Sequence, residues 1–95
     1  MQTLLIHDIP FRADLIPILD TDISLLLIQG TKGMLGCGYV SLAAAEKFAH
    51  PLAIVAGVST FDDMLSAPVK AVTPAAAALG VTPGMTGRAA LLAMA

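Results

Sequence analysis

Two short apolar runs constrain the fold of this chain more than any other feature. Residues 23–30 (ISLLLIQG) and 52–58 (LAIVAGV) contain almost no polar side chains. Runs of this length, rich in Leu, Ile and Val, are typical of strands that are covered on both faces of a sheet. They are too short for a membrane-spanning helix, which needs about 18 or more apolar residues. We therefore expect buried strands in a sheet covered by helices, and no membrane partner.

A tight turn follows the first apolar run. The segment GTKG, residues 30–33, separates it from a second β-type segment, MLGCGYV, at residues 34–40. Two β-type runs joined by a short glycine-bounded loop predict a hairpin. Residues 3–9 favour a strand that Pro10 ends, and the Asp- and Pro-containing residues 11–22 indicate a loop with a short extended piece.

Beyond residue 40 the sequence alternates between helix signals and short β-type segments. Each expected helix starts at a Ser or Thr whose hydroxyl can cap the first turn. These expected caps are Ser41, Ser59 or Thr60, Thr73 and Thr86. A short strand is expected at residues 69–72. The predicted fold class is α/β (α+β): a single small domain over residues 1–95, with a mixed sheet and an N-terminal hairpin packed by about four short helices.

The amount of apolar surface predicts self-association. Hydrophobic residues make up 57% of the chain and charged residues 13%, whereas about 25% charged residues is usual in soluble domains. A chain of this length buries only about 60–65% of its unfolded surface, so its apolar groups exceed its interior. Residues 71–95 contain a single charge, Arg88. Because helices that are apolar all round are normally buried, we expect a partner subunit to cover the C-terminal helices in a homo-oligomer.

Charge and cysteine content exclude several function classes. The net charge of −2, with five basic residues spread along the chain, argues against a nucleic-acid partner because phosphate binding needs a basic face. Cys37, His7 and His50 lack the spacing of metal ligands, so no metal is expected. A single cysteine and an N-terminus without a secretory signal fit a cytoplasmic protein. No motif identifies a cofactor.

Cys37 lies between two glycines, and this raises the question of reactivity. If the strand continued through residue 40, Gly36 and Gly38 would share one face and Cys37 the other. The glycines predict close backbone packing by a helix, a neighbouring subunit or a ligand. Cys37 itself is either a small buried hydrophobic residue or a candidate catalytic nucleophile, which would need a base or a positive neighbour.

Two glycine-containing turns are candidate binding sites. The turn before the last helix presents free N–H groups near Arg88, a combination that suits a phosphate or a carboxylate. The turn that follows the second apolar run lies where α/β sheets often hold ligands. The candidate ligand-binding residues are Gly57, Thr60, Gly84, Thr86, Gly87 and Arg88. Ordinary helix capping is the alternative explanation for both turns.

Three segments in a fixed order, GCGY, GVSTFDDML and LGVTPGMTGRAALL, resemble a known family. They are similar to the YunC-like domain of unknown function, found in small bacterial and archaeal proteins, and the similarity covers residues 30–92. The resemblance implies an α/β fold in which helices pack a sheet. It implies no reaction, because the family has no established activity.

Three function classes remain open. The favoured one is a homo-oligomeric module that binds a small anionic ligand or a partner, since it accounts for the glycine-rich turns and the apolar excess together. The second is an enzyme that uses Cys37 or a site at a subunit interface. The third is a structural or assembly protein without a ligand. Titration of the thiol separates the second class from the others, because an enzyme of this kind needs an accessible, acidic cysteine.

Overall fold

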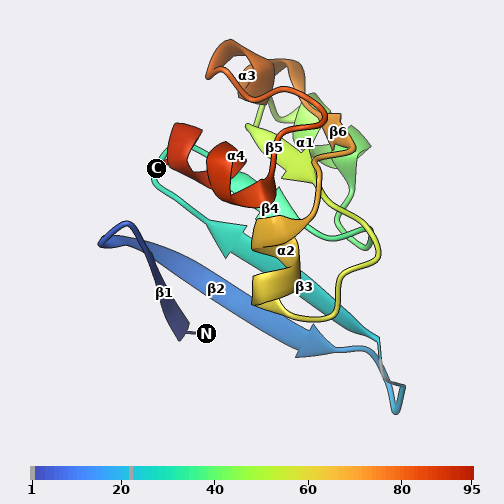
Figure 1. The fold of residues 1–95 in the computed structure, drawn as a ribbon. Coiled ribbons are helices and arrows are strands. Elements are labelled where there is room, and N and C mark those ends of the chain that lie inside the picture. The colour runs from blue at the N-terminus through green and yellow to red at the C-terminus, as the bar shows by residue number, and fades with distance from the viewer. Residues whose placement is uncertain (1, 22) are drawn as a thin grey trace.

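A mixed sheet extends through the structure, with its strands in the order of the chain (Figure 1). The computed structural model describes residues 2–21 and 23–95. Within those residues the six strands are β1 (Gln2–Ile6), β2 (Ile9–Pro17), β3 (Ser24–Gln29), β4 (Met34–Gly36), β5 (Leu52–Ile54) and β6 (Ala71–Val72). The β4–β5 pair is parallel, and the other neighbouring strands are antiparallel.

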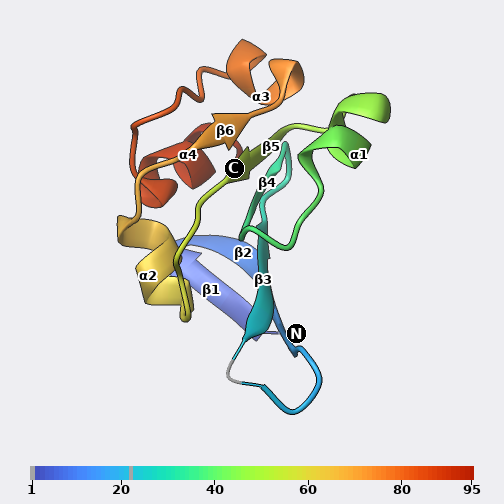
Figure 2. The same cartoon turned by 90° about the vertical axis from the view of Figure 1, so that its right-hand side faces the viewer.

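Helices cover both faces of this sheet to different extents. In the described part of the chain they are α1 (Leu42–Lys47), α2 (Phe61–Ser66), α3 (Pro74–Ala78) and α4 (Gly87–Ala93). Figure 2 shows α2 and α4 on one side of the sheet and α1 on the other. The N-caps are Ser41, Thr60, Thr73 and Thr86, and the side chain of each accepts a hydrogen bond from a backbone N–H three residues later. The predicted α+β fold, including the short helices and their caps, is confirmed.

The main core lies between the sheet and helices α2 and α4. Leu26, Ile28 and Leu35 from the sheet are fully buried there, as are Met64 of α2 and Leu91 of α4. The two helices approach closely at Gly87, where a Cβ atom would collide with the carbonyl oxygen of Met64. Glycine at this position therefore allows the first turn of α4 to pack against the end of α2.

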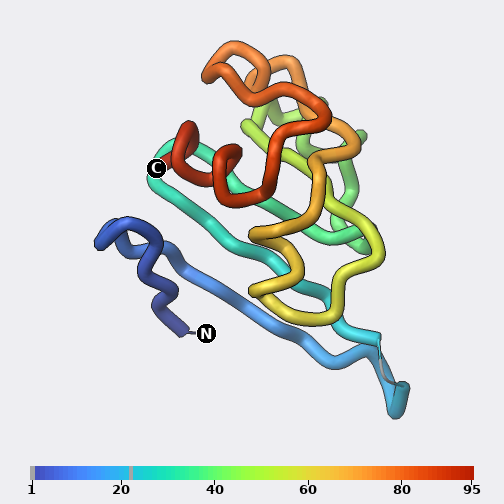
Figure 3. Tube along the Cα trace, viewed as in Figure 1, coloured from blue at the N-terminus to red at the C-terminus, as the bar shows by residue number. Residues whose placement is uncertain are grey.

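The β3–β4 hairpin has the predicted turn but a shorter second strand. Gln29 pairs with Met34, and the N–H of Gly30 donates to the carbonyl of Gly33 at 2.8 Å. The chain end packs on this turn (Figure 3), where the N–H of Lys32 donates to the carbonyl of Met94 at 2.9 Å. The hairpin is confirmed, but β4 ends at Gly36 rather than extending to residue 40.

The N-terminal segment differs from the prediction. Residues 11–22 were expected to form a loop, whereas β2 continues to Pro17 and pairs with β1 and β3. A two-residue turn at His7 and Asp8, with φ of 50° and 64°, connects β1 to β2 as in tight hairpins. Pro10 and Pro17 lie near the ends of the strand, where proline is tolerated. The loop prediction was therefore wrong.

Coverage of the apolar surface also differs from the prediction. At the last helical segment Leu91 and Met94 are fully buried within this chain, Leu92 is half-buried, and the outward-facing residues of α3 are small. Most of the apolar surface of the C-terminal helices is therefore covered by the chain itself. Apolar surface is exposed instead near the N-terminus. The large hydrophobic residues exposed there are Leu5, Ile9, Leu15, Ile16, Leu19 and Ile23.

Strand β3 was expected to be covered on both faces, and it is covered on one. Leu26 and Ile28 point into the core and are fully buried, whereas Leu25 and Leu27, which alternate with them, are half-buried. Leu25 and Leu27 lie on the face of the sheet that points away from α2 and α4. The prediction failed because a continuous apolar run does not show which face receives a helix.

Candidate functional site

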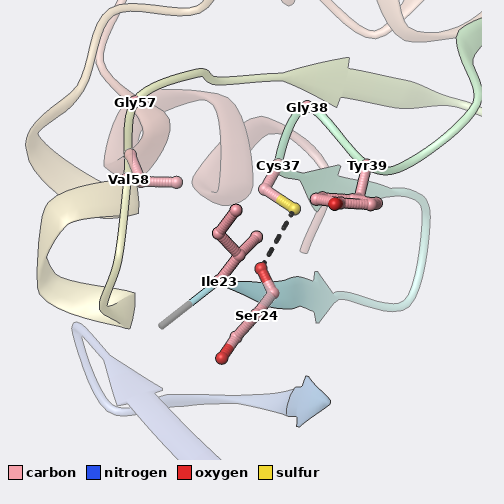
Figure 4. Close-up of a pocket in the computed structure, with 7 residues that line it drawn as sticks. All are labelled: Ile23, Ser24, Cys37, Gly38, Tyr39, Gly57 and Val58. Atoms are coloured by element: carbon pink, nitrogen blue, oxygen red, sulfur yellow. Dashed lines mark hydrogen bonds between the residues drawn. The ribbon is translucent and has the colours of Figure 1, made fainter. Parts of the chain in front are cut away.

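A pocket of about 330 Å³ lies at the carboxyl ends of the parallel strands β4 and β5. Its lining residues, drawn in Figure 4, are Ile23, Ser24, Cys37, Gly38, Tyr39, Gly57 and Val58. They come from the start of β3, the turn after β4 and the loop after β5. The carboxyl ends of parallel strands are where α/β sheets commonly bind ligands, so the topology makes this pocket the candidate site.

The Cys37 side chain is held by the backbone of β3. Its Sγ accepts a hydrogen bond from the N–H of Leu26 at 3.3 Å and lies 4.0 Å from the carbonyl oxygen of Ser24 (Figure 4). The residue is 4% exposed. Among the described residues, no His, Lys, Arg, Asp or Glu lines the pocket. The described residues therefore supply the thiol with hydrogen bonds but with no general base, which nucleophilic catalysis would need.

Backbone N–H groups are the main polar feature of the two loops that line the pocket. Those of Gly38, Tyr39, Gly57 and Val58 make no hydrogen bond within the described part of the chain. A Cβ atom at Gly38 would meet no atom within 4 Å, so this residue borders open space. Gly57 has a φ of 71°, which glycine adopts without strain. The site thus combines backbone donors with apolar side chains from Ile23 and Val58.

Of the predicted binding residues, Gly57 lines the pocket and Thr60 lies three residues beyond it. The Thr60 hydroxyl accepts from the N–H of Asp63 at 3.0 Å. The Asp63 carboxylate in turn accepts from the N–H groups of Ser59 and Thr60, at 3.0 and 3.2 Å. This reciprocal arrangement is a capping box. It accounts for the polar residues at the start of α2.

The other predicted binding residues lie at the opposite end of α2. The N–H of Gly87 donates to the carbonyl of Ala67 at 3.0 Å, and that of Gly84 donates to the carbonyl of Val69 at 2.8 Å. The Thr86 hydroxyl accepts from the N–H of Ala89 at 3.2 Å. Arg88 is exposed there. The structure therefore divides the predicted set into two groups, at the beginning and at the end of α2, and does not bring them together.

The glycines that flank Cys37 have different surroundings. A Cβ atom at Gly36 would lie 2.7 Å from a methyl carbon of Val40, so close packing occurs there, with the turn folded back through a bond from the Val40 N–H to the Cys37 carbonyl at 3.0 Å. Gly38 has no such neighbour within the described residues. The two glycines do not form one bare face, because β4 ends between them.

A second hollow of about 240 Å³ lies at the opposite end of the β3–β4 hairpin, lined by residues 29–34, His50 and Pro51. Sequence reasoning did not identify it, because His50 was considered as a metal ligand and lacks the spacing of one. It also did not identify Ser24 and Tyr39 at the first pocket, since Ser24 lies in no motif and Tyr39 was noted only as part of the segment GCGY. Within residues 2–21 and 23–95, no group of three His, Cys, Asp or Glu side chains could hold a metal ion. In the same residues no helix has the length and apolar character needed to span a membrane.

Comparison with known proteins gives the family. A family model described as "Domain of unknown function (DUF1805)" matches residues 36–94. The chain belongs to this family. The uncharacterized protein YunC of Bacillus subtilis is 35% identical over 98 residues, which cover 99% of this chain and 95% of that protein. The resemblance to a YunC-like domain is thereby confirmed.

The fold is shared with a solved structure. A crystal structure of a protein of unknown function, TA1206 from Thermoplasma acidophilum, matches with a TM-score of 0.90 and 29% sequence identity, over 99% of this chain and 90% of that one. The segment matched by the DUF1805 model contains Cys37, Gly38, Tyr39, Gly57 and Val58, whereas the β3 side of the pocket precedes it. Most of the candidate site is therefore built from the part of the chain that defines the family.

Proposed function

We propose that the protein is a small homo-oligomeric module that binds a small anionic ligand in the pocket beside Cys37. One observation carries the proposal: four backbone N–H groups that have no partner among the described residues belong to residues that line a pocket at the carboxyl ends of β4 and β5. Loop N–H groups of this kind bind anions such as phosphate and carboxylate. The domain over residues 1–95 would act as one binding unit.

The size and lining of the pocket favour a compact ligand. Its volume of about 330 Å³ is near the lower end of the range for small-molecule sites, which is about 300–1,000 Å³. None of the described lining residues is acidic, so none of them would repel an anion. The Tyr39 ring, 53% exposed, lies at the edge of the pocket and can cover an apolar part of the ligand.

Thermal unfolding with added inorganic phosphate tests this proposal. At ten times its dissociation constant, a ligand of the native state stabilises it by about 1.4 kcal/mol, which raises Tm by about 6–11 °C for a domain of this size. Acetate and citrate are measured in parallel, as small carboxylates. Sodium chloride at equal ionic strength controls for screening.

The variant Gly38→Leu locates the site. Gly38 has an ordinary φ and open space around it, so the added side chain should occupy the pocket without disturbing the fold. The Tm increase with phosphate should disappear in this variant. Ala77→Leu, on the exposed side of α3, adds the same side chain elsewhere and should leave the increase intact. A ligand effect that persists in Gly38→Leu would place the ligand elsewhere.

An enzyme that uses Cys37 is the second candidate, because this thiol lines the same pocket. The candidate is less well supported, since no His, Asp, Glu or Lys is among the described residues that line the pocket. The variants Cys37→Ala and Cys37→Ser separate the two functions. Binding that survives in both variants favours the module. A covalent adduct on the Cys37 thiol of the wild type that is absent from both variants favours the enzyme. A protein with no response to any of these anions would favour a structural role.

Self-association and a cytoplasmic location complete the proposal. The apolar composition, 57% hydrophobic and 13% charged, and the exposed hydrophobic side chains between residues 5 and 23 support an oligomer. Sedimentation over a range of concentrations tests it. The single cysteine fits a reducing compartment, and imaging of a tagged protein in its own cell tests the location.

A further inference from the structure

We propose that two copies of the chain associate through the face of β1, β2 and β3 that carries Arg12 and Asp14, with Arg12 of each copy opposite Asp14 of the other. We call this the open face. The assignment rests on the proposed self-association and is independent of the ligand. It identifies both the surface and the partner, which is a second copy of this chain.

Strand register defines the open face. Residues directly opposite each other in antiparallel strands project to the same side. Arg12 pairs with Thr3 of β1 and with Gln29 of β3. The next residues on that side of β2 are Asp14, which pairs with Leu27, and Ile16, which pairs with Leu25.

The opposite side of β2 carries the core residues. Phe11 and Ala13, which alternate with Arg12 along the strand, are 2% and 1% exposed. The helices α2 and α4 lie on that side of the sheet (Figure 2). The open face therefore points away from the main core.

No helix of the described residues covers the open face. The helix on that side, α1, packs against β5 at the other end of the sheet. Leu5 and Ile16 are consequently 66% and 55% exposed, and Leu25 and Leu27 are half-buried. The exposed apolar side chains thus lie on both sides of the Arg12 and Asp14 positions, and exposed apolar surface next to polar groups is found at interaction sites.

The charges on the open face suit a second copy. Arg12 Nε lies 3.2 Å from Asp14 Oδ2, and the two side chains are 62% and 21% exposed. An interface with two-fold symmetry uses the same patch on both copies, so the patch must be complementary to itself. A neighbouring positive and negative charge meet this condition. A two-fold axis that passes between Arg12 and Asp14 places Arg12 of each copy against Asp14 of the other copy. A membrane or a nucleic acid would require an excess of basic residues, and the described residues of this face include one positive and one negative charge, Arg12 and Asp14.

The size of the open face predicts a dimer that dissociates on dilution. Nine residues of β2 at about 3.3 Å each, across three strands spaced by about 4.8 Å, give a face of roughly 400 Å². Two copies would bury roughly 800 Å², which is below the about 1,200–2,000 Å² of stable complexes and in the range of weak, transient ones. We therefore expect a monomer–dimer equilibrium in the micromolar range rather than a permanent assembly.

Sedimentation velocity of charge-reversal variants tests the proposal. R12D leaves two negative charges on the face and D14R leaves two positive charges, so each variant alone should be monomeric at concentrations where the wild type is a dimer. An equimolar mixture of R12D and D14R should form a heterodimer, and native mass spectrometry should show one copy of each. K70D is the matched control, because it reverses an exposed lysine beside β6 and should leave the dimer intact.

The outcomes test the assignment to the open face separately from the self-association itself. A wild type that is monomeric up to millimolar concentration would overturn both. If R12D and K70D both remain oligomeric to the same extent as the wild type, the assignment to this face is overturned, whereas the self-association still holds. A mixture that stays monomeric would overturn the two-fold arrangement of the charges. Far-UV circular dichroism verifies folding, and if D14R is unfolded, I16D tests the same face and should be monomeric.

Discussion

Gly87 gives the sharpest test of how the helices pack. Replacing it with alanine adds a Cβ atom that would collide with the carbonyl oxygen of Met64 and lie 2.9 Å from a methyl carbon of Leu35. The backbone oxygen cannot rotate away, so α4 must shift. The shift weakens the hydrogen bond from the Gly87 N–H to the Ala67 carbonyl. This glycine is therefore predicted to serve packing rather than ligand approach.

The magnitude follows from three contributions. Overpacking of a tight site costs about 1–3 kcal/mol, and a weakened backbone hydrogen bond costs about 1 kcal/mol more. The better helix propensity of alanine returns up to about 1 kcal/mol. We expect Gly87→Ala to lower the free energy of unfolding by about 2 kcal/mol, which corresponds to a decrease in Tm of about 8–16 °C.

Urea unfolding followed by circular dichroism measures this change. Gly38→Ala is the matched control, because a Cβ atom there meets nothing within 4 Å. It should leave stability unchanged or raise it by up to about 1 kcal/mol. If Gly87→Ala were within about 0.5 kcal/mol of the wild type, the range of a neutral surface change, the close approach of α4 to α2 would be refuted.

Three further predictions concern buried groups. Thr73→Val should lower the free energy of unfolding by about 1–3 kcal/mol in urea titrations, since it leaves the buried N–H of Leu52, 3.0 Å from the Thr73 hydroxyl, without its acceptor. Cys37 should react with a disulfide reagent at least about tenfold more slowly in the native than in the urea-unfolded protein, because a buried thiol is poorly accessible; equal rates would contradict its burial. Gly36→Ala should destabilise the protein by about 1–3 kcal/mol through contact with Val40, and Val40→Ala in the same chain should recover part of this loss, as a double-mutant cycle can measure.

The sequence predicted those parts of the fold that depend on local chemistry. The helix starts were predicted correctly because a Ser or Thr that is visible in the sequence also caps the first turn of the helix that follows it. Thr73 is an example. The β3–β4 hairpin was correct because its turn is short and bounded by Gly30 and Gly33. Strand β2 was missed because Pro10, Asp14 and Pro17 resemble loop residues. Pairing with strands on both sides outweighs their low strand propensity.

The candidate site was predictable only in part. Gly57 and Cys37 were identified, because a glycine after a buried strand and a lone thiol are visible in the sequence. Ser24 and Tyr39 were not identified, since they reach the pocket through strand pairing that no local pattern encodes. Thr60 and Gly87 belong to two turns that were predicted as separate candidate sites, and the sequence did not show that these turns lie at different ends of α2. Spatial grouping of this kind depends on the length and direction of α2, which the motifs do not specify.

The order of the strands in the sheet has a consequence for the folding kinetics. Neighbours in the sheet are also neighbours along the chain, so the three antiparallel pairs from β1 to β4 can form by closing short loops, which is fast. The parallel pair β4–β5 is different, because residues 37–51 must first cross over through α1. We expect this pair to form after the β1–β2–β3–β4 meander. The pocket beside Cys37 spans the same junction, so its two walls would come together in the late phase of folding, when most of the sheet already exists.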